Sequence, residues 1–87
     1  MISNQAIDKI VYDIDLSPYY FTQWEVVVEN HTILVQADVD NWYILRDLEV
    51  DIISDADGEE AELPREQFDY LWRELQAKLD EMVLNAA

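Results

Sequence analysis

The chain has 87 residues, of which 20 are Asp or Glu and only 5 are Lys or Arg, so its formal net charge at pH 7 is -15. Nucleic acids and anionic membranes are bound through Lys and Arg, and a chain this acidic is therefore expected to repel both. It contains no cysteine, which excludes disulfides, thiol nucleophiles and thiolate metal sites. The length allows one domain.

The remaining composition is that of a folded protein. Hydrophobic residues make up 51% of the chain and aromatic residues 11%, whereas disordered acidic segments are poor in both. The first ten residues lack the basic start and apolar stretch of a signal peptide, and no apolar run approaches the roughly 18 residues of a membrane span. We therefore expect a cytoplasmic protein without a membrane segment.

Apolar and polar residues alternate along four segments in the first two-thirds of the chain, a pattern typical of β-strands with one buried face. The segments are rich in β-branched and aromatic residues, and short polar turns such as Asn30-His31 and Asp40-Asn41 separate them. Strands joined so closely favour an antiparallel meander. The predicted strands span about residues 9–16, 20–29, 32–39 and 42–53.

The fourth segment leaves one point of register open. Strict alternation would place Arg46 on the buried face between Ile44 and Leu48. A β-bulge or a break near Arg46-Asp47 would shift the alternation by one residue and avoid this.

The last third of the chain predicts a helix. An acidic loop over 54–62 contains the only glycine, Gly58, and Pro64 follows at a position suited to the first helical turn. Apolar residues then recur at intervals of three and four to about residue 84. We expect the α+β class: a four-stranded antiparallel β-meander with one C-terminal amphipathic helix packed on one face (ββββα), in a single domain of residues 1–87. The predicted helical stripe consists of Phe68, Leu71, Trp72, Leu75, Leu79, Met82 and Val83.

Signatures of catalysis and of cofactor binding are weak. The one histidine, His31, lies in a predicted turn, and a single glycine cannot form a phosphate-binding loop. Segment 55–60 resembles part of a calcium loop, but Ile53 and Pro64 occupy the first and twelfth positions, where carboxylates are required. We expect neither an enzyme nor a dedicated metal or cofactor site.

The positions of the acidic residues carry the functional signal. Within 47–62 there are eight acidic residues and no base, and the acidic residues of several predicted strands are two residues apart, which places them on one face about 6.6–6.8 Å apart. The same alternation also places some apolar residues on the outward face, where they could anchor a partner. Trp42 fits either the core or such an anchor. The predicted partner-binding residues are Asp13, Asp15, Glu25, Glu29, Asp38, Asp40, Asp47, Glu49, Asp51, Asp55, Asp57, Glu59 and Glu60, with Tyr43 and Leu45 as anchors.

A face of like charges destabilises a sheet, so its retention indicates a partner that neutralises it. In size, acidity and strand-spaced carboxylates the chain resembles the small acidic inhibitors of phages and mobile elements, such as nucleic-acid-mimicking anti-CRISPR and anti-restriction proteins. This resemblance is one of physical type and assigns no residue. The leading hypothesis is therefore a DNA mimic that blocks a basic nucleic-acid-binding protein. Two alternatives remain: an immunity protein or antitoxin for a basic toxin, and a structural or assembly module of a phage or larger complex.

Overall fold

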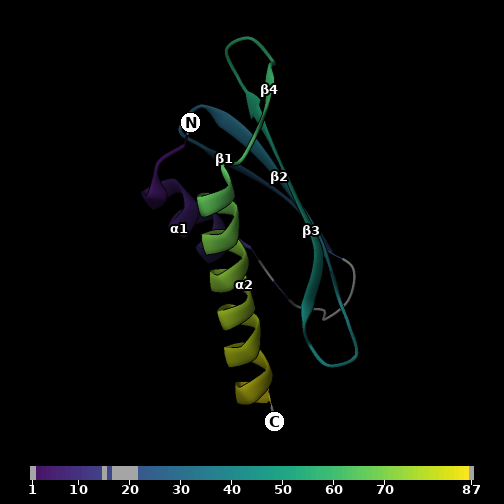
Figure 1. Cartoon of the computed structure of the whole chain (residues 1–87). Helices are drawn as coiled ribbons and strands as arrows, with labels where there is room; N and C mark the ends of the chain where they lie inside the picture. Colours follow the sequence, from purple (N-terminus) through teal and green to yellow (C-terminus); the bar gives the residue numbers. More distant parts are fainter. Residues whose placement is uncertain (1, 15, 17–21, 87) are drawn as a thin grey trace.

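The computed structural model describes residues 2–14, 16 and 22–86, which form two helices and a four-stranded sheet (Figure 1). In chain order the elements are α1 (Asn4–Asp13), β1 (Thr22–Val28), β2 (His31–Val39), β3 (Leu45–Ser54), β4 (Glu60–Glu62) and α2 (Arg65–Ala86).

The sheet is an antiparallel meander in which sequential strands are neighbours, in the order β1-β2-β3-β4. The predicted α+β class, with four antiparallel strands and a C-terminal helix, is confirmed. The strands predicted over 20–29, 32–39 and 42–53 correspond to β1, β2 and β3, although residues 20 and 21 lie outside the described residues. The helix predicted over about 64–84 corresponds to α2.

The strand predicted over residues 9–16 is wrong, because residues 9–13 belong to α1 and Ile14 is its C-terminal cap. Ile10 and Ile14 are four residues apart, a spacing that fits both a strand of period two and a helix of period 3.6. Ile7 completes the helical face and is fully buried with them, whereas Tyr12, which strand parity would bury, is 84% exposed.

A local hydrogen-bond signal favours the helix here. The side chain of Ser3, the N-cap residue, accepts a hydrogen bond from the amide of Ala6 at 3.1 Å. This bond satisfies an amide that the first helical turn leaves without an intrahelical partner. The backbone amide and hydroxyl of Ser3 also donate to the carboxylate of Glu29, which joins the start of α1 to the β1–β2 turn.

The fourth strand lies where the sequence predicts only a loop. Part of segment 54–62 forms a tight turn, in which the amide of Gly58 donates to the carbonyl of Ser54 at 2.8 Å. Gly58 has φ 71, a conformation that costs a glycine little. The chain then returns along β3 as β4, which pairs only with Asp51–Ile53.

A β-bulge in β3 resolves the register. Gln36 of β2 is paired with Glu49, and Asp38 with Arg46, so β3 uses one residue more than β2 between these two pairs. Within the bulge Asp47 has φ 55. Asp and Asn tolerate this left-handed region better than most residues with a side chain.

The bulge places the right side chains in the core. Leu45 and Leu48, which are three residues apart, are both buried, and Arg46 between them is exposed. Strict alternation would have buried Arg46 and exposed Leu45. Of the two arrangements that the sequence left open, the bulge is therefore correct.

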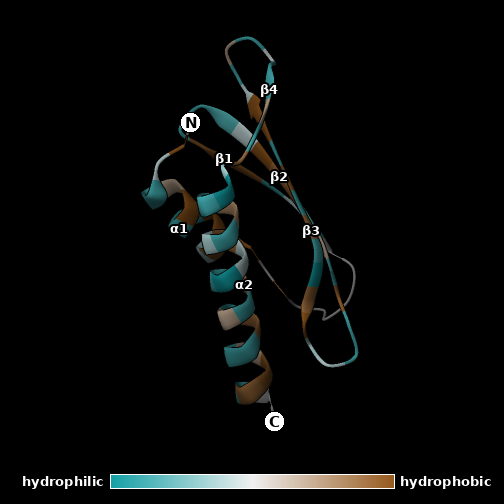
Figure 2. Ribbon diagram, viewed as in Figure 1, coloured by the Kyte–Doolittle hydropathy of each residue, from teal (hydrophilic) through white to brown (hydrophobic). Residues whose placement is uncertain are grey.

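The core lies between one face of the sheet and the two helices, which occupy the same side of it (Figures 1 and 2). Helix α1 packs against β1 and α2, and α2 also packs against β3. Leu71, Leu75 and Leu79 are fully buried, as the predicted stripe requires. No helix in the described part of the chain is long and apolar enough to cross a membrane.

Lys78 of α2 fixes the end of α1. Its ammonium group donates to the carbonyl oxygens of Val11 at 2.7 Å, Tyr12 at 3.2 Å and Ile14. The last carbonyls of a helix have no intrahelical donor and carry partial negative charge, so a cation there is favourable. Lys78 thus connects the two helices through backbone atoms.

We predict that Lys78→Met lowers the free energy of unfolding by about 1–3 kcal/mol, because it leaves the partly buried carbonyls without their donor. Lys9→Met is the matched control, since it removes the same charge from an exposed Lys9–Asp13 pair on α1. Urea unfolding followed by circular dichroism measures both variants. Equal losses in the two variants would contradict the role assigned to Lys78.

Candidate functional site

The helices leave one face of the sheet uncovered, and we call it the outer sheet face. Alternation along each strand brings its side chains to the side opposite the core. Several of them are carboxylates, and the apolar ones are few. The face consists of Gln23, Glu25 and Val27 of β1, Thr32, Leu34, Gln36 and Asp38 of β2, Arg46, Glu49, Asp51 and Ile53 of β3, and Glu60 and Glu62 of β4.

Strand pairing gathers the carboxylates of this face. Leu34 is paired with Glu25 on one side and with Asp51 on the other, and Asp51 is paired in turn with Glu62. These four residues form one row across the whole sheet. Its carboxylates have no salt bridge among the described residues. Asp51 and Glu62 lie directly opposite each other, an arrangement that destabilises a sheet.

The base on the same face of β3 does not form an ion pair with this row. Arg46 of β3 lies on the outer sheet face opposite Asp38, and its guanidinium Nε lies 2.6 Å from the Asp40 carboxylate, with which it pairs. Among the described residues, the carboxylates of Glu25, Asp51 and Glu62 therefore have no ion pair, whereas Asp38 lies opposite Arg46.

Asp13 is a predicted partner-binding residue that does not belong to this face. Asp13 lies at the end of α1, on the helical side of the molecule, and pairs with Lys9 at 2.8 Å. Its assignment to the sheet is wrong for the same reason as the strand over 9–16. Asp15 lies outside the described residues.

Two others organise turns. Asp40 accepts hydrogen bonds from the amides of Trp42 at 2.9 Å and Ile44 at 3.0 Å, in addition to its pair with Arg46. The hydrogen bond from Arg46, followed by that from the Ile44 amide, lowers the pKa of Asp40 below its usual value. The hydrogen bonds from Ser3 likewise lower the pKa of Glu29. Both carboxylates are committed to local structure.

The acidic loop also divides into bonded and unbonded carboxylates. Asp55 accepts from the Thr32 hydroxyl at 2.9 Å, and Asp57 accepts from the amide of Glu59 at 3.0 Å. These bonds shape the β3–β4 turn. Glu59 and Glu60 are exposed, and Glu60 continues the outer sheet face.

The residues predicted as apolar anchors differ in their exposure to solvent. Leu45 is fully buried, so its assignment to the outer face is wrong, because the bulge at Asp47 reverses the parity of the strand before it. Tyr43 is 41% exposed and lies in the β2–β3 turn. Trp42 is 82% exposed, which settles its alternatives in favour of the surface.

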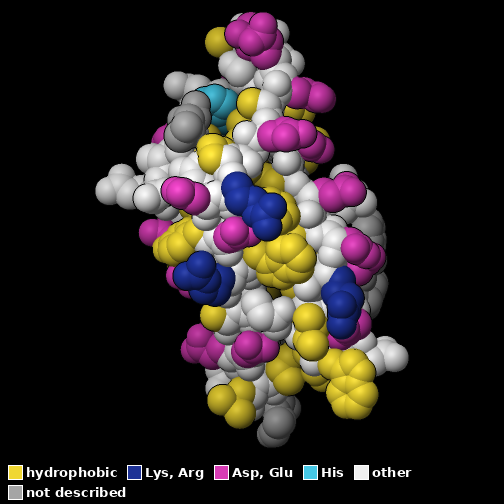
Figure 3. All heavy atoms as spheres, in the orientation of Figure 1, with side chains coloured by type: hydrophobic (Ala, Val, Ile, Leu, Met, Phe, Trp, Pro, Cys, Tyr) yellow, Lys and Arg dark blue, Asp and Glu magenta, His cyan; other side chains and the backbone are white. Residues whose placement is uncertain are grey.

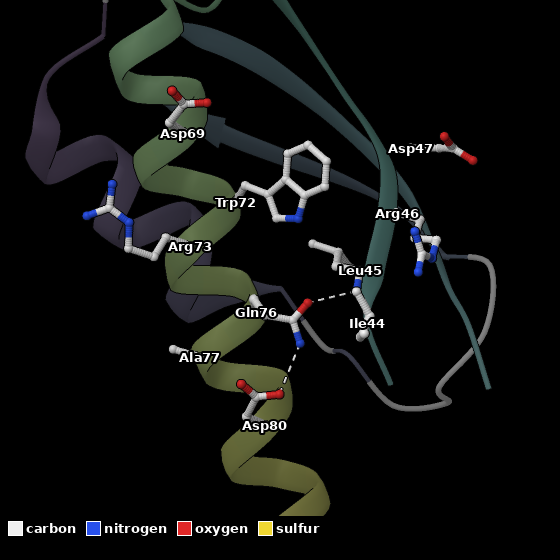
Figure 4. Close-up of a pocket in the computed structure, with 10 residues that line it drawn as sticks. All are labelled: Ile44, Leu45, Arg46, Asp47, Asp69, Trp72, Arg73, Gln76, Ala77 and Asp80. Atoms are coloured by element: carbon white, nitrogen blue, oxygen red, sulfur yellow. Dashed lines mark hydrogen bonds between the residues drawn. The ribbon is translucent and has the colours of Figure 1, made fainter. Parts of the chain in front are cut away.

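Sequence reasoning missed two features. Glu62 completes the carboxylate row, whereas the prediction from sequence places a loop at this position. The alternation of Glu60, Ala61 and Glu62 is the pattern that indicates a strand here. The second missed feature is a groove of about 1050 Å³ between β3 and α2, lined in part by Trp72 and Gln76 of α2 (Figure 4). No sequence pattern brings these two elements together.

The shifted pKa values are those of structural groups. Tyr70 of α2 donates its hydroxyl to Asp8 of α1 at 2.7 Å, and this bond raises the pKa of Tyr70 to about 12. The pKa values of Tyr70, Asp40 and Glu29 are all shifted further from pH 7. A general acid or base instead has a pKa near the working pH.

Comparisons add no assignment. Among the described residues, no group of three or more His, Asp or Glu side chains is arranged to hold a metal ion. No protein-family model matches the chain, and no curated protein or solved structure shows significant similarity to it.

We predict a pH-dependent contribution from Asp40. A lowered pKa in the folded state means that the carboxylate stabilises the protein above its unfolded pKa, about 4, and that this stabilisation is lost as the pH falls through the folded value. The difference in unfolding free energy between wild type and Asp40→Asn should therefore be constant from pH 7 to about pH 5 and shrink below about pH 4. Urea titrations at each pH measure it, with Asp38→Asn as control. A difference that stays constant down to about pH 2 would contradict it.

We also predict that Asp51→Lys stabilises the protein. Lysine at this position would face Glu62 and replace a like-charge pair by an opposite-charge pair, a gain of about 0.2–1 kcal/mol. The gain should fall at about 1 M salt, where charges are screened beyond about 3 Å. Urea unfolding at low and high salt measures the effect, and Glu81→Lys on α2 makes the same charge change away from the sheet. An equal gain in both variants would attribute the effect to net charge alone.

Proposed function

We propose that the protein is a non-enzymatic inhibitor whose outer sheet face occupies the basic nucleic-acid-binding surface of another protein and mimics a phosphate backbone. The observation that carries this proposal is the row formed by Glu25, Leu34, Asp51 and Glu62, whose carboxylates have no basic partner among the described residues. Carboxylates in this arrangement repel one another and lower stability. A partner that supplies Lys and Arg would remove this cost.

The spacing of the charges supports mimicry. Outward side chains on one strand are about 6.6–6.8 Å apart, twice the axial distance of about 3.4 Å between the phosphates of one DNA strand. Glu49 and Asp51 of β3 have this separation in sequence, as do Glu60 and Glu62 of β4. Because hydrogen bonds hold the strands, the carboxylates are presented on a rigid surface.

The apolar residues of the same face support a protein partner. Val27 is 59% exposed, and Leu34 and Ile53 are partly exposed among the carboxylates. Protein interfaces combine apolar groups that become buried with a charged surround, which guides association. The same face would also suit a basic toxin, so an immunity protein remains the second candidate, and the identity of the bound protein distinguishes the two.

The test uses the full chain as an affinity bait in a lysate of its host. We expect wild type to retain a basic nucleic-acid-binding protein, and we expect Glu49→Lys with Asp51→Lys to lose it. Glu66→Lys with Glu81→Lys is the matched control, because it makes the same charge change on exposed positions of α2. Retention should weaken between about 50 and about 500 mM salt.

Competition gives the decisive measurement. A nucleic-acid mimic binds the same site as the nucleic acid that it imitates. An excess of duplex DNA or of structured RNA should therefore release the retained protein from the bait. Retention that survives both the Glu49 and Asp51 substitutions and the added nucleic acid would refute the proposal. A retained nuclease or other toxin that this chain neutralises would favour the immunity protein.

A further inference from the structure

Strand β3 has a free edge. β4 pairs with it only at Asp51–Ile53, so within the described residues Leu45–Val50 have no strand partner on the side of α2. An edge strand carries backbone groups that can pair with a strand of another chain. The bulge at Asp47 lies within this stretch.

A side chain supplies hydrogen-bond partners for the backbone at one end of this edge. The carboxamide of Gln76 on α2 accepts from the amide of Leu45 at 2.7 Å and donates to the carbonyl of Tyr43 at 3.0 Å (Figure 4). In a parallel pair, one residue bonds in this way to the residues before and after its neighbour. Gln76 thus takes the place of a strand residue opposite Ile44, and the stretch of β3 from Arg46 onward lies beyond its reach.

The edge borders the groove of about 1050 Å³ between β3 and α2. Trp72 points from α2 toward β3 above Leu45 and Ile44 (Figure 4). Its ring is partly exposed, and its indole N–H has no hydrogen-bond acceptor among the described residues. Hydrophobic side chains gather on this side of the molecule, with both basic and acidic side chains around them (Figure 3).

The two sides of an added strand would meet different chemistry. Side chains of a strand alternate between the two faces of the sheet. On the side of α2 they would meet Trp72 and Ala77, with the charged Asp69, Arg73 and Asp80 also lining the groove. On the other side they would meet Glu49, and Asp47 also points away from α2 (Figure 4).

We infer that the groove binds an extended segment of a partner protein in which apolar and basic side chains alternate, and that this segment adds a strand to the free edge of β3. Its apolar side chains pack against Trp72 and its basic side chains pair with the carboxylates of Asp47 and Glu49. A second copy of this chain is a poor occupant, because two chains of charge -15 repel each other. The inference rests on the proposed function in one respect, since Glu49 belongs to the outer sheet face.

The test is a titration of the isotopically labelled full chain with an acetylated, amidated seven-residue peptide of alternating Lys and Val, followed by NMR. We expect shifts of the Trp72 indole N–H and of the amides of residues 46–49, and slower hydrogen exchange of those among these amides that face the free edge. A peptide of the same sequence with alternate backbone nitrogens methylated keeps its charge but cannot pair with a strand, and it should bind at least about tenfold more weakly. Equal binding of both peptides, or shifts confined to the outer sheet face, would overturn the inference.

A matched pair of variants separates this inference from the proposed function. Ala77→Lys places a cation in the groove at an exposed position, and Leu84→Lys makes the same change elsewhere on α2, where Leu84 is 76% exposed. We expect Ala77→Lys, but not Leu84→Lys, to weaken binding of the Lys-Val peptide at least about tenfold. If Ala77→Lys leaves peptide binding intact while Glu49→Lys with Asp51→Lys abolishes retention of the basic partner, the groove inference fails and the proposed function stands. Concentration-dependent dimerisation in sedimentation, lost in Ala77→Lys, would instead assign the groove to a second copy.

Discussion

The structure depends on the difference between the two faces of one sheet. Every strand except β4 contributes buried apolar side chains to one face, and both helices cover that face. Neither helix covers the other face, which receives most of the acidic residues of the described strands, since a charged group is costly to bury without a partner. The placement of the carboxylates is therefore a consequence of burying the apolar residues. What the core alone does not explain is that, in the described strands, Arg46 is the one lysine or arginine among these acidic residues.

The few cations of the chain are used mostly for local structure. Lys78 holds the last carbonyls of α1, Arg46 holds the β2–β3 turn through Asp40, and Lys9 and Arg65 pair with acids one helical turn away. None of these bonds neutralises the row of Glu25, Asp51 and Glu62. The protein thus keeps its open face strongly negative while it uses positive charge to fix its turns and helix ends. This distribution is the physical basis of the proposed binding function.

Much of the fold follows from the sequence, because period and turn signals agree over β1, β2, β3 and α2. The error in residues 9–16 arose where the period was ambiguous: Ile10 and Ile14 fit either element, and the capping bond of Ser3 decides for the helix. The candidate site was partly predictable, since outward parity identifies Glu25, Glu49 and Asp51 once the strands are correct. Asp40 and Glu29 form hydrogen bonds that hold local structure, and Gln76 lines the groove. These features depend on tertiary contacts that no local sequence pattern encodes.

The bulge at Asp47 has a consequence for how this chain can vary. Because side chains of a strand alternate strictly, the extra residue is what allows Leu45 and Leu48 to share one face. Removal of a single residue here would turn Leu45 to solvent and Arg46 to the core, and it would also rotate the whole β2–β3 turn relative to α2. Exchange of one exposed side chain for another would leave this geometry intact at positions other than Asp47, whose positive φ disfavours β-branched residues. In this segment the length of the chain is therefore under tighter constraint than its composition, and related sequences should align across it without single-residue gaps.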